Sequence, residues 1–96
     1  MSRIEKLKKD SAPILSRYQV KKSAVFGSYA RGDHNKNSDI DLLIEFEKDM
    51  GGILVMVRLK RDLEAITKRT VDLGTFKSLN KRVKKYVQKD LIQIYG

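Results

Sequence analysis

The sequence predicts a mixed α/β domain, in which helices cover one face of a small mixed sheet of about three strands. Two observations lead to this fold class. Segments with the apolar spacing of helices alternate along the chain with short aliphatic segments typical of strands. The chain has 96 residues, which is enough for one small hydrophobic core. We therefore expect residues 1–96 to form a single domain.

The first half of the chain is expected to form a helix, a strand, a short helical turn and a loop. Apolar residues recur at helical spacing over residues 3–18, where Pro13 can kink or split the helix. Residues 23–27, Ser-Ala-Val-Phe-Gly, are typical of a short buried strand. Residues 28–31 have the character of a first helical turn, and the turn formers over 33–38 predict a loop.

The second half is expected to form a strand, a helix, a strand and a last helix. Apolar and polar residues alternate over 39–46, which predicts a strand with one face in the core. Two glycines at 51–52 interrupt the chain, and helical spacing returns over 53–68. Residues 70–74, Thr-Val-Asp-Leu-Gly, predict a third strand. Residues 79–95 carry an apolar stripe that predicts a helix.

The composition limits the possible chemistry and location. The chain has no cysteine and one histidine, which excludes thiolate zinc sites and histidine-rich metal sites. Any metal must therefore be held by oxygen, which favours magnesium, manganese or calcium. No apolar run approaches the roughly 18 residues that a membrane span needs, and the N-terminus lacks a signal-peptide pattern. We expect a cytoplasmic protein that does not bind membranes.

The charge is strongly positive overall but unevenly distributed. The formal net charge is +9, whereas residues 33–49 hold six acids and only two lysines. An acidic segment on a basic background suggests a cation site surrounded by groups that attract a polyanion. The alternative is that most lysines only keep the surface soluble.

Two short motifs, Gly27-Ser28 and Asp39-Ile40-Asp41, carry the chemistry. A glycine at the end of a strand allows a phosphate to approach the backbone, and the following helical turn offers unpaired N–H groups. Strand alternation places Asp39 and Asp41 on one face. Two carboxylates ~4 Å apart repel by roughly 4 kcal/mol at an effective dielectric constant of 20, and a cation between them reverses that sign. Each motif alone also fits an ordinary turn or a solvated strand face.

Asp72 supplies a third carboxylate. It stands between Val71 and Leu73, so it faces the same side as the Asp39 and Asp41 pair if the two strands are adjacent. Three carboxylates on strands suit magnesium, whose remaining positions are filled by phosphate oxygens and water. These residues together predict a metal-dependent nucleotide-binding site.

The motifs resemble those of the polymerase-beta-like nucleotidyltransferase superfamily. The stretches 27–33 and 38–44, the strand around Asp72 and the tail 91–96 are similar to its minimal nucleotidyltransferase (MNT) branch. The resemblance covers nearly the whole chain and implies the polymerase-beta-like α/β fold. It also implies that the chain is the antitoxin of a HEPN/MNT toxin–antitoxin pair.

The resemblance assigns roles to individual residues. It implies that Asp39, Asp41 and Asp72 are catalytic and hold two Mg²⁺ ions. It implies that Gly27, Ser28 and Arg31 bind the phosphates of a nucleoside triphosphate, with ATP as the expected substrate. Asp39 and Asp41 would bridge both ions, and Asp72 would accept the proton of the acceptor hydroxyl.

The acceptor is expected to come from a partner protein, because 96 residues leave no room for a second substrate-binding domain. The resemblance implies transfer of AMP to a tyrosine hydroxyl of a HEPN-domain ribonuclease toxin, in a hetero-oligomer that neutralises the toxin. The excess of apolar residues over 53–59 is consistent with an interface or with a well-buried helix. Two alternatives stay open: an antitoxin that acts by binding alone, and a nucleotidyltransferase for RNA or a small molecule. Direct nucleic-acid binding is compatible with the charge but not favoured.

Overall fold

The computed structural model describes residues 1–48, 51–78 and 89–96. Within these ranges, three helices, α1 (Arg3–Arg17), α2 (Gly27–Arg31) and α3 (Ile53–Thr67), combine with four strands. The strands are β1 (Val20–Phe26), β2 (Ile40–Phe46), β3 (Val71–Thr75) and β4 (Ile92–Tyr95), and a short 3-10 turn, η1 (Phe76–Ser78), follows β3. The α/β class with a mixed sheet is confirmed, although the sheet has four strands rather than about three.

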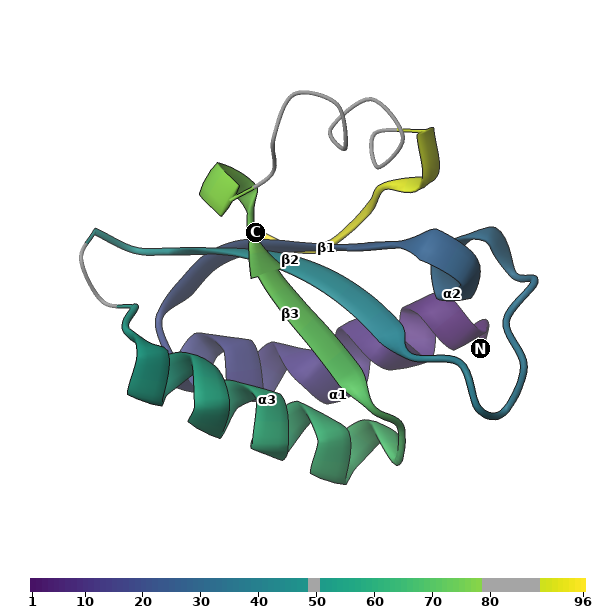
Figure 1. Cartoon of the computed structure of the whole chain (residues 1–96), viewed down its shortest axis with the longest axis horizontal. Coiled ribbons are helices and arrows are strands. Elements are labelled where there is room, and N and C mark those ends of the chain that lie inside the picture. The colour runs from purple at the N-terminus through teal and green to yellow at the C-terminus, as the bar shows by residue number, and fades with distance from the viewer. Residues whose placement is uncertain (49–50, 79–88) are drawn as a thin grey trace.

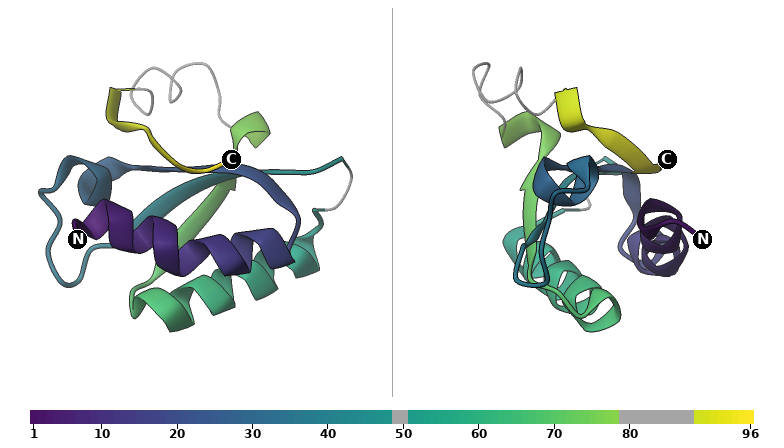
Figure 2. Two further views of the ribbon diagram at one scale, coloured as in Figure 1. Left: turned by 180° about the vertical axis from the view of Figure 1, so that it is seen from behind. Right: turned by 90° about the vertical axis from the view of Figure 1, so that its right-hand side faces the viewer.

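The two long helices, α1 and α3, lie side by side under one face of the sheet (Figures 1 and 2). The strand order is β3-β2-β1-β4, with β2 and β3 parallel and the other pairs antiparallel. The α3 helix makes the crossover that a parallel pair requires. The core forms between this face and the helices, from Leu15, Ile44, Leu59 and Leu63 among others.

The N-terminal helix α1 is capped by Ser2, whose own backbone is extended. The Ser2 hydroxyl accepts a hydrogen bond from the Glu5 backbone N–H at 3.1 Å, which satisfies one of the free donors of the first turn. The helix runs without a break through Pro13, which the sequence had suggested as a kink. None of the helices in the part of the chain that the structure describes has the length and apolar character needed to cross a membrane.

The prediction of a helix over residues 79–95 was wrong at its end. Residues 92–95 form β4, which pairs with the free edge of β1. Ile92 and Ile94 alternate with polar residues, and Ile94 is buried against α1 and β1. The pairing satisfies backbone groups at the β1 edge, which no local spacing in the sequence reveals. The part of the predicted helix over 79–88 lies outside the described residues.

Candidate active site

The carboxylates lie at the start of the parallel pair β2 and β3. Asp41 pairs directly with Asp72 in the β2–β3 register, which confirms the strand adjacency that the prediction required. Ile40 and Leu42, on either side of Asp41, are buried in the core under the sheet. Alternation therefore directs Asp41 to the opposite face, away from α1 and α3. Asp39 precedes β2 directly and is exposed, as is Asp72.

Gly27 brings the predicted phosphate-binding turn against this carboxylate pair. It follows β1 at the point where Phe26 pairs with Asp41, and it begins α2 with a φ of +75°. A Cβ atom on Gly27 would lie 2.5 Å from Oδ2 of Asp41. Both the left-handed backbone and this close approach favour glycine over residues with a side chain. Gly27, from the first predicted motif, thus lies against Asp41, from the second.

Asp41 is the half-buried carboxylate of this site. Its partial burial raises the pKa of the carboxyl group above the ordinary value, and the negative charges of Asp72 and Asp39 raise it further. The Arg31 guanidinium acts in the opposite direction but does not cancel these effects. The arrangement therefore favours either a proton or a cation at Asp41.

The three carboxylates suit a hard divalent cation in their chemistry, and two of them, Asp41 and Asp72, are neighbours in the strand register. Three carboxylates and no competing thiol match the oxygen ligands that Mg²⁺ prefers. Within residues 1–48, 51–78 and 89–96, no three potential ligands already stand in a geometry that could hold a metal ion. Asp39 and Asp72 are exposed, so their side chains are free to turn toward a cation that offsets the repulsion at Asp41. The metal roles of the three residues stay predictions.

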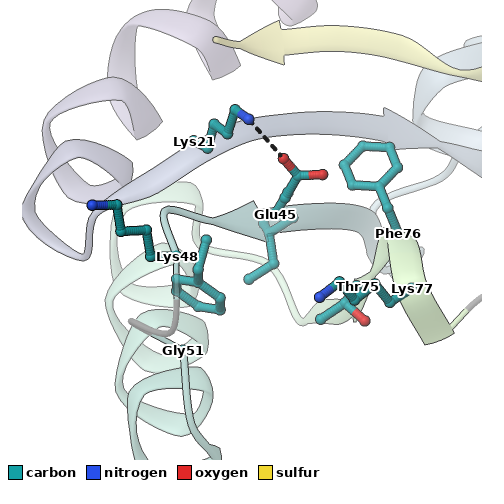
Figure 3. Close-up of a pocket in the computed structure, with 9 residues that line it drawn as sticks. Lys21, Glu45, Lys48, Gly51, Thr75, Phe76 and Lys77 are labelled. Atoms are coloured by element: carbon teal, nitrogen blue, oxygen red, sulfur yellow. Dashed lines mark ion pairs between the residues drawn. The ribbon is translucent and has the colours of Figure 1, made fainter.

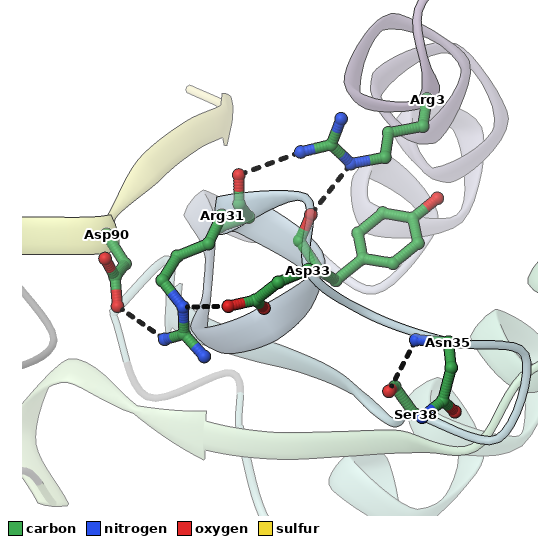
Figure 4. Close-up of polar contacts among 8 residues, drawn as sticks. Arg3, Arg31, Asp33, Asn35, Ser38 and Asp90 are labelled. Carbon is green, nitrogen blue, oxygen red and sulfur yellow. Dashed lines mark hydrogen bonds and ion pairs between the residues drawn. The ribbon is translucent and has the colours of Figure 1, made fainter.

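Arg31 lies at the edge of the site and forms two ion pairs (Figure 4). Its Nε donates to Asp33 at 3.1 Å, and one of its terminal nitrogens donates to Asp90 at 2.9 Å. Both hydrogen bonds raise the pKa of Arg31 further above its already high value. The predicted phosphate contact of Arg31 would therefore compete with Asp33 and Asp90. Asp90 was not singled out from the sequence, because 59 residues separate it from Arg31.

Two further arginines support the site and were also missed. Arg69 donates to the carbonyls of Asn35 at 2.8 Å and Ser38 at 3.2 Å, which fixes the loop directly before Asp39. The Arg69 guanidinium also lies 5.5 Å from the ring centroid of Tyr29. Arg3 donates to the carbonyls of Tyr29 and Ala30, both at 2.9 Å, and so ties α1 to α2 (Figure 4). In the sequence both resemble the many surface cations around them.

Comparisons with known proteins identify the family of this chain. A family model described as a nucleotidyltransferase domain matches residues 5–94. A provisionally assigned protein adenylyltransferase of Methanocaldococcus jannaschii is 35% identical over 91 residues, which cover 95% of this chain and 97% of that protein.

Solved structures give the same result for the fold. The structure of a provisionally assigned minimal nucleotidyltransferase superposes with a TM-score of 0.78 at 31% identity, and the match covers 95% of both chains. A chain from the complex of a tri-AMPylated HEPN toxin with an MNT antitoxin of Shewanella oneidensis shares the fold, with a TM-score of 0.72 at 18% identity. That match covers 97% of this chain and 72% of the other. This protein therefore belongs to the nucleotidyltransferase domain family, as a minimal nucleotidyltransferase of the protein adenylyltransferase kind.

Proposed function

We propose that this protein transfers AMP from ATP to a tyrosine hydroxyl of a HEPN-domain toxin and thereby acts as its antitoxin. The observation that carries the proposal is the close approach of Gly27 to the Asp41 carboxylate, with Asp72 paired across the adjacent strand. The turn that we propose binds phosphate thus lies against one of the carboxylates that we propose hold metal. The similarity to protein adenylyltransferases over nearly the whole chain supports AMP as the group transferred.

Each residue of the site has its own role in an in-line displacement. The backbone at Gly27 and the Ser28 hydroxyl bind the triphosphate, and Asp39 and Asp41 would hold two Mg²⁺ ions, with Asp72 holding one of them. Bound Mg²⁺ supplies Lewis acidity that offsets charge on the transferring phosphoryl group.

The acceptor hydroxyl oxygen attacks the α-phosphorus, and the bond from that phosphorus to the bridging oxygen of the β-phosphate breaks. Asp72 takes the hydroxyl proton, and pyrophosphate leaves with its charge offset by Arg31. We place this reaction in the cytoplasm, where ATP is available.

The proposal is tested with a candidate HEPN-domain partner protein, incubated with this protein, ATP and MgCl₂. Peptide mapping by mass spectrometry should find AMP on a tyrosine, and the ribonuclease activity of the toxin should fall with modification. An Asp39→Asn/Asp41→Asn variant should bind the toxin but leave it unmodified and active. Full neutralisation by that variant would instead establish an antitoxin that works by binding alone.

The net charge of +9 favours one other candidate, a nucleotidyltransferase that acts on RNA. It predicts nucleotide addition to RNA ends without any protein partner, and RNA affinity that falls steeply as the salt concentration rises. Addition to RNA by the wild type, with no addition to the toxin, would replace the first proposal.

A further inference from the structure

We propose that the far end of β2 and β3 from the carboxylates forms a docking surface for an acidic amphipathic segment of the acceptor protein. The proposal rests on the proposed function and names where the partner is held during transfer. The surface consists of a basic pocket and an adjoining apolar groove. Two independent observations, one of charge and one of apolar exposure, lead to it.

The basic pocket is a cavity of about 510 Å³ that opens at the ends of β2 and β3 (Figure 3). Lys21, Lys48 and Lys77 line it, and the only described carboxylate in its lining is Glu45. Lys21 lies 3.6 Å from a Glu45 carboxylate oxygen, so one lysine is already paired within the described residues. Lys48 and Lys77 give the described lining an excess of positive charge. This excess is complementary to carboxylates on a partner.

The apolar groove adjoins the pocket, and the two share Phe46, Gly51 and Thr75. Phe46, Ile53, Met56 and Val57 form its apolar walls at the start of α3. Ile53 is 84% exposed and Val57 is 48% exposed, while the neighbouring Leu54 is 72% exposed. Three large aliphatic side chains exposed within one and a half turns of a helix are typical of an interaction site. The apolar excess predicted over 53–59 is thus partly on the surface.

The combination favours an acidic amphipathic segment over two other occupants. A second copy of this chain would bring a net charge of +9 against a basic pocket, which disfavours self-association. RNA would use the lysines but gains little from exposed aliphatic side chains, because bases stack on aromatic and guanidinium planes. A helix with one apolar and one acidic face satisfies both parts of the surface at once.

The position of the surface suits an acceptor protein. Glu45, in the pocket, lies on the same face of β2 as Asp41, four residues further along the strand. At about 3.3 Å per residue the separation is about 13 Å. A partner that covers about 800 Å² of this protein spans that distance. A segment held at the pocket can therefore leave a neighbouring hydroxyl group of the same partner beside Asp72.

The test measures binding of the HEPN-domain partner separately from AMP transfer. Affinity is measured by calorimetry without ATP for the wild type, Ile53→Asp/Leu54→Asp and Lys48→Glu/Lys77→Glu. We expect each double variant to weaken binding by about tenfold or more, as central contacts of an interface do. The loss in the lysine variant should shrink at high salt, because screening removes the attraction. In transfer assays kcat/KM for the partner should fall while the KM for ATP stays unchanged.

Control variants carry substitutions of the same kind elsewhere, one apolar and two charged. Ile66→Asp changes an aliphatic residue that is 45% exposed at the other end of α3, and Lys8→Glu/Lys9→Glu reverses two exposed charges on α1. Both should bind the partner like the wild type. Melting temperatures should confirm that all variants are folded. The aspartates of Ile53→Asp/Leu54→Asp lie in the first turn of α3, where the helix dipole favours negative charge.

The outcomes separate the docking surface from the proposed function. Wild-type affinity in both test variants would overturn the docking surface even if AMP transfer is found. A partner that loses affinity in the test variants but is never modified would support the docking surface and contradict the proposed function. RNA binding weakened by Lys48→Glu/Lys77→Glu, with partner binding intact in Ile53→Asp/Leu54→Asp, would overturn the assignment to a protein segment.

Discussion

Replacing Gly27 with alanine should separate the stability of the fold from the chemistry of the site. The φ of +75° at Gly27 costs an alanine roughly 1 kcal/mol. The new Cβ would lie 2.5 Å from Oδ2 of Asp41, so the half-buried carboxylate must turn away, at a further cost of about 1 kcal/mol. For a chain of this length a loss of about 2 kcal/mol lowers the melting temperature by about 10 °C.

Gly32 provides a matched control, because its backbone also has a positive φ. Its φ is +91° at the C-cap of α2, but a Cβ there would meet the flexible end of Arg3, at 3.0 Å, instead of a site carboxylate. Gly32→Ala should therefore lose about 1 kcal/mol of stability and keep most of its activity.

The assay is AMP transfer from ATP at a temperature where both variants are folded. Gly27→Ala should lower kcat/KM by about 100-fold, since displacement of a catalytic group by about 1 Å has effects of this size. Equal activity in Gly27→Ala and Gly32→Ala would refute the inference that the turn and the Asp41 carboxylate form one site.

Three further predictions concern the charges of the site. Asp41→Asn should raise the melting temperature without metal at neutral pH. The pKa of Asp41 is raised in the folded state, so ionisation of Asp41 destabilises the wild type as the pH rises through the carboxyl range. In thermal melts from about pH 4 to 7, the melting temperatures of the two proteins should differ only above the ordinary carboxyl pKa. Addition of MgCl₂ should raise the melting temperature of the wild type but not of Asp41→Asn/Asp72→Asn, and an equal rise in both would place the ion elsewhere. Arg69→Met should lower the free energy of unfolding by about 1–3 kcal/mol, because the 33–38 loop loses two hydrogen bonds to its carbonyls. The variant should reduce kcat more than it changes the KM for ATP. An unchanged kcat would show that Arg69 does not support Asp39.

The sequence predicted the carboxylate face because strand alternation is a local property. Ile40, Leu42 and Ile44 are buried, and Asp41 lies between them as the alternation requires. Even here the pattern was incomplete, because Leu43 shares the face of Asp41 and is nevertheless 1% exposed. Its burial depends on what covers that face of the sheet, which alternation within one strand does not contain.

Non-local contacts explain what the sequence did not predict. The strand β4 has only four residues, and the three-residue spacing of Leu91 and Ile94 fits a helix as well as the alternation of Ile92 and Ile94 fits a strand. The free edge of β1 decides between them. Likewise, Arg69 reaches carbonyls 31 and 34 residues away, so its role follows from the fold and not from a motif.

The intact mass of the HEPN-domain partner tests the central claim most directly. The partner is incubated with ATP and MgCl₂, with either the wild-type protein or Asp39→Asn/Asp41→Asn. The account predicts that the partner gains the mass of one or more AMP groups with the wild type and gains nothing with the variant. A partner whose mass stays unchanged with the wild-type protein, while the two proteins bind each other, would contradict it.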